Sequence, residues 1–184
     1  ISAGREKINA NQEIIDLVQA IGCKRGEKFN SKDIRYEKII IMTDADVDGA
    51  HISTLLMAFF YKEFPKLIDE GHLYLSVPPL YRITKGSKIL YAVNDKHKDE
   101  IIKKEFKGSE VNINRFKGLG EMMPAQLKET TMSPDNRTLL KVQIASKDKK
   151  STLKSVDALM GKKPELRFKF ITENSKKISA ENIL

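Results

Sequence analysis

The sequence contains a single cysteine, Cys23, which excludes an internal disulfide and any metal site built from several cysteines. No apolar run approaches the roughly 20 residues that a membrane-spanning helix needs. The first residues also lack the charged and then apolar pattern of a signal peptide. Internal repeats and low-complexity tracts are missing as well. These absences favour a soluble globular protein, and a cytoplasmic location is the expectation.

The composition allows one sizeable domain or two small ones, because 184 residues with 40% hydrophobic content can bury a modest core. Charged residues make up 32% of the chain, and the formal net charge is +8. A positive balance of this size indicates a polyanionic partner such as nucleic acid. Lysine-rich solubility would produce the same charge, so charge alone does not decide the function.

The hydrophobic pattern alternates between helices and strands. Residues 11–22 (NQEIIDLVQAIG) have helical spacing, and Gly22 is the predicted stop signal by residue type. Residues 36–43 (YEKIIIMT) form a β-branched run that predicts a central strand buried on both faces of a parallel sheet. The same patterns predict a buried helix over 49–64, a strand over 72–77, a hairpin over 80–93, a helix over 95–106, a strand over 111–116, a short helix from 124, a strand over 138–144 and helices over 151–161 and 164–174.

Three aspartates follow the β-branched run at alternate positions, in the stretch IIIMTDADVDG over residues 39–49. If the strand continues through Asp44, then Asp44, Asp46 and Asp48 project from one face at steps of roughly 6.5 to 7 Å. Carboxylates this close need a cation, and the carboxyl end of a strand is where open parallel sheets bind ligands. Hard oxygen ligands suit Mg²⁺, which completes its shell with water and phosphate. The pattern therefore predicts metal-assisted chemistry on a phosphodiester.

The aspartates allow two other interpretations. DADVDG matches the first half of a calcium-binding EF-hand loop, but Leu55 stands where that loop needs a bidentate glutamate, and a strand pattern precedes it. Helix capping is the second interpretation, because Asp48 could accept hydrogen bonds from amides near Ala50 and His51. For Asp48, capping and metal binding both stay open.

Three stretches together resemble a known family: IIIMTDADVDGAHISTLLMAFFY (39–61), EGHLYLSVPPLYRI (70–83) and RFKGLGEMMPAQLKETTMSP (115–134). They are similar to the Toprim and tail region of the B subunit of bacterial type IIA DNA topoisomerases, and to topoisomerase IV more than to gyrase. The resemblance implies an α/β fold: a Rossmann-like parallel Toprim sheet, with its first strand missing, over residues 1–80, and a smaller α+β tail domain over residues 81–184.

The resemblance also implies an enzyme of two A and two B subunits that passes one DNA duplex through a break in another, using ATP. Family members hold Mg²⁺ with an upstream Glu-Gly-Asp-Ser motif and with the aspartates that match Asp44 and Asp46, and Asp48 is the third acidic member. The Glu-Gly-Asp-Ser motif and the ATP-binding domain are not in this sequence. The two-ion site is therefore expected to be incomplete, and this chain alone is expected not to cleave DNA.

Other residues are weaker candidates for contacts with DNA or with the A subunit. His51 matches a family histidine, although a supporting hydrogen bond would explain it equally well. In RFKGLGEM, two glycines permit a tight turn, and Arg115 and Lys117 could reach a phosphate or the acidic site. A simple strand-to-helix turn is the other interpretation of this stretch. Any DNA contact is expected to be with the backbone and tolerant of sequence.

Three further functions stay open at this point: a gyrase B subunit, a free-standing Toprim nuclease or primase, and a scaffold that binds metal or DNA without catalysis. The stretch RFKGLGEM argues against the nuclease or primase. The sequence upstream of this chain would discriminate among them, because the topoisomerase interpretation requires Glu-Gly-Asp-Ser there.

Overall fold

The computed structural model describes residues 5–175, which divide into two compact units. Within the described part, unit 1 comprises residues 5–37, 57–70 and 143–175, and unit 2 comprises residues 38–56 and 71–142. The chain therefore passes back and forth between the units. Each unit has its own core.

The regular secondary structure of unit 1 is helical in its described residues. Its α-helices are α1 (Arg5–Ala10), α2 (Gln12–Ile21), α4 (Pro65–Asp69), α7 (Lys149–Met160) and α8 (Pro164–Asn174), with 3-10 turns at Gly26–Lys28, Ser31–Asp33 and Ser146–Asp148. The predicted helix over 11–22 is confirmed. The Asn11 side chain accepts a hydrogen bond from the Ile14 N–H at 2.9 Å, and Gly22 ends the helix at φ 87°, a conformation that favours glycine.

Aromatic packing stabilises the middle of unit 1. The rings of Phe59, Phe60 and Phe64 contact one another with centroids 5.5 to 5.9 Å apart. Phe60 and Phe64 are almost fully buried, as is Leu67 on α4. Each of these side chains stabilises the unit by about 1.5–3 kcal/mol relative to an exposed position.

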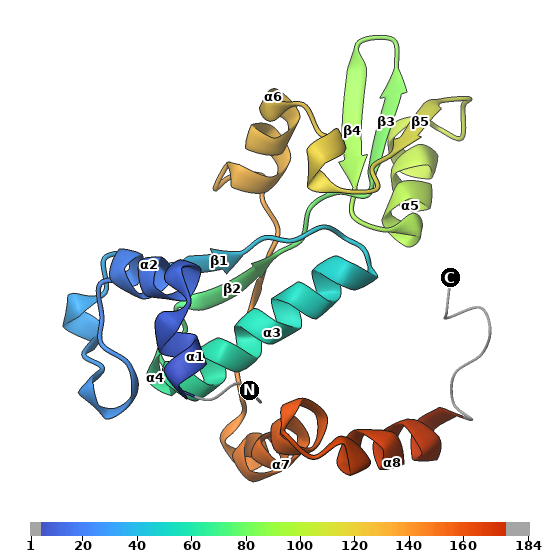
Figure 1. Ribbon diagram of the computed structural model, residues 1–184. Helices are drawn as coiled ribbons and strands as arrows, with labels where there is room; N and C mark the ends of the chain where they lie inside the picture. The colour runs from blue at the N-terminus through green and yellow to red at the C-terminus, as the bar shows by residue number, and fades with distance from the viewer. Residues whose placement is uncertain (1–4, 176–184) are drawn as a thin grey trace. The chain divides into compact units, whose positions relative to one another are not determined.

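Unit 2 contains two three-stranded sheets (Figure 1). Its strands are β1 (Ile39–Ile41), β2 (Leu73–Ser76), β3 (Tyr81–Lys85), β4 (Lys88–Ala92), β5 (Asn112–Arg115) and β6 (Leu139–Lys141). The first sheet has the order β1-β2-β6, in which β1 and β2 are parallel and β6 is antiparallel to β2. The second has the order β4-β3-β5 and is antiparallel.

The predicted central position of the isoleucine strand is wrong. Within residues 5–175, β1 pairs only with β2 and so lies at a sheet edge. Ile41 is buried, whereas Ile39 and Ile40 are half-buried. An apolar run reports what covers the two faces of a strand, and it carries no information about hydrogen-bonding neighbours on either side.

The second sheet and helix α5 (Asp95–Glu105) enclose a separate core. Tyr81, Ile83, Ala92 and Phe106 are its buried members, with partly buried apolar side chains packed around them. The predicted hairpin is confirmed, and Gly86 at φ 57° makes its turn. The predicted helix, strand and short helix beyond the hairpin also form, as α5, β5 and α6 (Pro124–Leu127).

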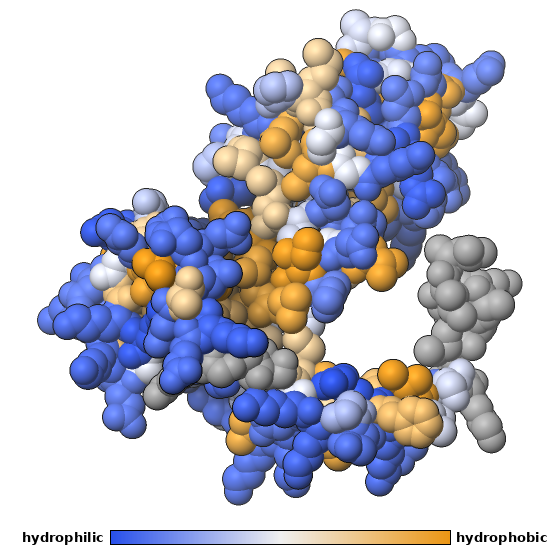
Figure 2. Space-filling model, in the orientation of Figure 1, coloured by the Kyte–Doolittle hydropathy of each residue, from blue (hydrophilic) through white to orange (hydrophobic). Residues whose placement is uncertain are grey.

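Helix α3 (Val47–Glu63) contributes its first part to unit 2 and its last part to unit 1. Helix α6 continues into a π-helical turn at Lys128–Met132, and a 3-10 turn at Leu119–Glu121 precedes it. No helix among residues 5–175 combines the length and the apolar character needed to cross a membrane. Hydrophilic side chains cover most of the face drawn in Figure 2.

Candidate metal and nucleic-acid site

The aspartates lie at the start of helix α3 in a loop of unit 2. Strand β1 ends at Ile41 and α3 begins at Val47, so Asp44 and Asp46 are loop residues and Asp48 lies in the first helical turn. All three are exposed. The expectation that they project from one face of a strand is therefore wrong, because the strand stops before the first of them.

Asp46 caps helix α3. Its Oδ1 accepts a hydrogen bond from the Gly49 N–H at 2.7 Å, and its carbonyl oxygen accepts from the Ala50 N–H at 3.0 Å. This is the N-cap arrangement, which satisfies backbone donors that have no partner inside the helix. The cap predicted for Asp48 thus belongs to Asp46, because the helix starts one residue after it.

Asp44 is held by a segment far along the chain. Its Oδ1 accepts a hydrogen bond from the Leu119 backbone N–H at 2.8 Å. Gly118 lies so close that a Cβ placed there would be 2.8 Å from Asp44 Oδ2, and a Cβ at Gly49 would be 2.1 Å from the Asp44 carbonyl oxygen. Two glycines therefore permit the backbone to surround this aspartate.

The stretch RFKGLGEM contacts the acidic loop through its backbone. Neither Arg115 nor Lys117 forms an ion pair with Asp44 or Asp46 in the part of the chain that the structure describes, although both were predicted to reach that site or a phosphate. The Lys117 N–H instead donates to Glu121 Oε2 at 2.8 Å. Sequence reasoning did not identify Gly118 and Leu119 as the residues that contact Asp44. The two glycines that flank Leu119 were the only sequence feature that could have indicated this close backbone approach.

Arg115 is placed by the second sheet. It pairs across the strands with Tyr81, and its guanidinium carbon lies 6.0 Å from the centroid of the Tyr81 ring. The Lys98 ammonium lies 4.8 Å from the same centroid. Two cations thus contact one aromatic ring, an arrangement that favours positive charge at both positions.

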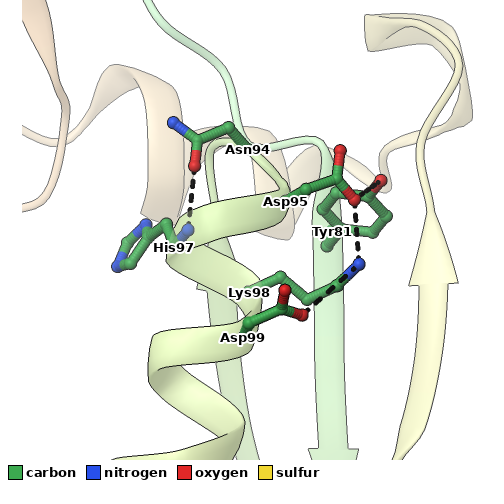
Figure 3. A network of polar contacts seen from close by, with 6 residues as sticks. All are labelled: Tyr81, Asn94, Asp95, His97, Lys98 and Asp99. Carbon is green, nitrogen blue, oxygen red and sulfur yellow. Dashed lines mark hydrogen bonds and ion pairs between the residues drawn. The ribbon is translucent and has the colours of Figure 1, made fainter.

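A polar network on α5 holds the Tyr81 ring (Figure 3). The Tyr81 hydroxyl and the Lys98 ammonium both donate to Asp95 Oδ1, each at 2.8 Å, and Lys98 lies 3.6 Å from Asp99. The hydrogen bond from Lys98, followed by that from Tyr81, lowers the pKa of the Asp95 carboxyl. The bond to Asp95 in turn raises the pKa of the Tyr81 hydroxyl. Asp95 therefore stays ionised and Tyr81 stays protonated at neutral pH.

His51 is exposed on α3, one turn beyond Asp48. The described residues give its side chain no hydrogen-bond or ion-pair partner. Its predicted contact with the acidic cluster therefore has no counterpart within residues 5–175, and a contact with DNA stays a prediction.

The carboxylate oxygens of Asp44 and Asp46 fit a magnesium ion that takes its remaining ligands from outside the protein. Asp44 and Asp46 each use one oxygen to accept a backbone N–H and keep further lone pairs. Neither has a lysine or arginine partner among the described residues. Those residues contain no group of three or more His, Cys, Asp or Glu side chains placed for a metal. Mg²⁺ is commonly bound by one or two carboxylates, with water and phosphate as its other ligands. The two carboxylates of Asp44 and Asp46 match this coordination.

Comparison with known proteins identifies the family. The model of the Toprim domain matches residues 6–78, and the model described as "DNA gyrase B subunit, carboxyl terminus" matches residues 108–172. The chain belongs to the B-subunit family of type IIA DNA topoisomerases. The resemblance found in the sequence and the α/β Toprim fold with a following tail are both confirmed.

Several relatives of this B-subunit chain are named as the B subunit of DNA topoisomerase 4. The protein from Bartonella bacilliformis is 58% identical over 175 residues, covering 95% of this chain and 25% of its own length. That from Caulobacter vibrioides is 54% identical over 180 residues, covering 98% and 26%. A DNA gyrase B subunit from Clostridium acetobutylicum is 47% identical over 175 residues, covering 94% and 27%. The chain spans about a quarter of the length of these relatives.

The domain boundary at residues 80 and 81 stays a prediction. The two family matches leave residues 79–107 unassigned, and the two compact units interleave along the chain.

Proposed function

We propose that this chain forms the magnesium-binding part of the DNA cleavage and religation site of a topoisomerase IV B subunit. Together with an A subunit, in an assembly of two A and two B chains, the complete protein performs ATP-dependent strand passage that relaxes and decatenates DNA. The contact between Asp44 and the Leu119 N–H supports this proposal most directly, because it joins the acidic motif to RFKGLGEM. The names of the relatives, which are B subunits of DNA topoisomerase 4, agree with it.

Asp44 is the first metal ligand in this proposal. The Leu119 N–H orients one carboxylate oxygen, and the exposed carboxylate keeps further lone pairs for a metal ion. Asp46 is the second ligand, and its cap bond to Gly49 fixes it at the start of α3. Bound Mg²⁺ would supply charge stabilisation at the scissile phosphate and the leaving oxygen.

The remaining site residues have supporting roles. Asp48 adds negative charge beside the two ligands, within the first turn of α3. Arg115, Lys117 and His51 contact the DNA backbone or the A subunit, as their exposure allows. No nucleophile is assigned to this chain, because the family resemblance places the attacking tyrosine on the A subunit.

The decisive experiment measures Mg²⁺-dependent DNA cleavage by a complete B subunit that carries this sequence, together with its A subunit. Asp44→Asn should lower cleavage by at least about 100-fold, since it removes a charge that holds the ion while keeping a similar shape. Asp135→Asn is the matched control, because Asp135 is exposed and has no described partner. Unchanged cleavage in Asp44→Asn would remove this residue from the mechanism.

A gyrase B subunit is the second candidate function. The 47% identity with the Clostridium acetobutylicum gyrase protein supports this alternative. The two activities differ in outcome on relaxed circular DNA. Introduction of negative supercoils by the reconstituted enzyme would identify a gyrase, whereas decatenation without supercoiling would identify a topoisomerase IV. We also propose a cytoplasmic location, since both activities act on DNA.

A further inference from the structure

Unit 1 contains a cavity of about 670 Å³ whose lining is strongly basic. Four cationic side chains and one carboxylate contribute to it. The lining residues that carry charge are Lys24, Arg25, Lys28, Arg35 and Glu63. The α1 and α2 region appears in blue in Figure 1, and hydrophilic side chains dominate its surface in Figure 2. All of these residues belong to unit 1, whereas the aspartate loop belongs to unit 2.

One arginine of the cavity is held by a hydrogen bond and an ion pair, and the other lies against Gly22. The Arg25 guanidinium donates to Asn9 Oδ1 at 3.0 Å and lies 3.9 Å from the buried Glu63 carboxylate. The Arg35 side chain crosses Gly22 so closely that a Cβ there would be 2.8 Å from its Cγ. Preorganised guanidinium groups lose little side-chain entropy on binding, and their planar donors match phosphate oxygens.

The cavity has an excess of unpaired positive charge. Glu63 is its only lining carboxylate, and within residues 5–175 Lys24, Lys28 and Arg35 have no ion-pair partner. Two more carboxylates, Glu27 and Asp33, lie on the same segment but do not line the cavity. Burial raises the pKa of the Cys23 thiol, so this lining side chain stays neutral at physiological pH.

We infer that this cavity is a second nucleic-acid contact, which binds phosphates of a DNA backbone through four cationic side chains, those of Lys24, Arg25, Lys28 and Arg35. Four cationic side chains line the cavity, more than a single phosphate group needs, which favours a polymer with successive phosphates over a single free anion. Lysine and arginine side chains bind phosphate oxygens whatever the base sequence, so we expect binding to be independent of sequence. Phosphate binding at this site requires neither a metal ion nor DNA cleavage. It can therefore be tested independently of the proposed function.

The experiment measures binding of the 184-residue chain to a short fluorescein-labelled duplex by anisotropy, in EDTA and over a range of KCl concentrations. The test variant carries Lys24→Gln and Lys28→Gln. Loss of two phosphate contacts should lower the slope of log affinity against log salt by about two. Both lysines are exposed, and a circular dichroism spectrum checks that the variant is folded.

The control variant carries Lys103→Gln and Lys104→Gln on α5, which removes the same net charge from exposed positions without described partners. Its salt slope should equal that of the unchanged chain. Equal slopes in the test and control variants would overturn the inference, because binding would then reflect diffuse charge.

Inorganic phosphate at matched ionic strength should not displace the duplex. Displacement that depends on Lys24 and Lys28 would instead identify a free-phosphate site.

Discussion

Asp44 accepts a hydrogen bond from the backbone N–H of Leu119, although the two residues are 75 positions apart in the chain. The bond brings the acidic loop before α3 into contact with the glycine-rich turn after β5. A backbone donor cannot be deleted by replacing its side chain, so the conformation of the turn decides whether Asp44 is held. Gly118 leaves room for the carboxylate, because a Cβ built there would lie 2.8 Å from Asp44 Oδ2.

Gly118→Ala should displace Asp44 and weaken metal binding. The added Cβ would lie 2.8 Å from Asp44 Oδ2, and the flexible carboxylate would move away to relieve the contact. Loss of a group that orients a metal ligand typically costs 10- to 100-fold in affinity, so we expect a loss of about tenfold or more. Calorimetric titration of the chain with Mn²⁺, which also prefers carboxylate oxygen, measures the effect.

Gly120→Ala is the control for this change, since no atom lies within 4 Å of a Cβ built at Gly120. It should leave the Mn²⁺ affinity unchanged. Equal losses in the two variants would mean that the turn responds to any added methyl group, and the specific role of Gly118 would be lost.

Asp46 should show separable effects on stability and on metal binding. Asp46→Ala removes the cap bond to Gly49 and should cost about 1 kcal/mol in the free energy of unfolding. Asp46→Asn keeps an oxygen acceptor at the N-cap, so it should be nearly as stable as the unchanged chain. Its Mn²⁺ affinity should nevertheless fall as strongly as that of the alanine variant. Urea unfolding and calorimetry measure the two properties. Asp48→Ala provides the comparison, and a stability loss there as large as in Asp46→Ala would contradict the assignment of the cap.

Gly49→Ala should destabilise unit 2 itself. A Cβ at this position would be 2.1 Å from the Asp44 carbonyl oxygen, and a backbone atom cannot move aside as a side chain can. Overpacking of this kind costs about 1–3 kcal/mol, which urea unfolding would detect. An alanine variant as stable as the glycine protein would show that the loop tolerates a shifted Asp44 backbone.

The choice of Asp44 and Asp46 as candidates came from sequence alone, because three carboxylates after an apolar strand have few physical explanations. Their geometry could not be predicted in the same way. Met42 and Thr43 are as compatible with a strand as with a loop, so the pattern did not show that β1 would stop at Ile41. The pattern also did not show that α3 would begin at Val47, which makes Asp46 the cap of this helix.

Contacts between distant segments were beyond the reach of local patterns. Every residue except proline carries an N–H, so nothing marked that of Leu119 as the partner of Asp44. In the same way, the pattern of residues 138–144 predicted a strand but not its pairing with β2, which brings Leu140 opposite Leu75. Helix α2 was predictable because its apolar spacing is a local signal, and α8 because Pro164 suits the first turn of a helix.

The Asp95 network should make the stability of unit 2 depend on pH at the acid end. Hydrogen bonds from Lys98 and Tyr81 lower the pKa of Asp95 in the folded protein, so its stabilising contribution is present above the unfolded pKa of about 3.9 and is lost as pH falls through the lower folded value. Asp95→Asn should therefore have a lower thermal unfolding midpoint than the unchanged chain at pH 7, and the difference should shrink below about pH 4. The raised pKa of Tyr81 keeps its hydroxyl protonated, so the difference should persist up to about pH 10.

Circular dichroism melts across this pH range measure the unfolding midpoints. Asp135→Asn is the control for loss of an exposed carboxylate that has no described partner. A difference between Asp95→Asn and the unchanged chain that stayed constant down to about pH 3 would show that the ionised Asp95 carboxylate does not stabilise the network.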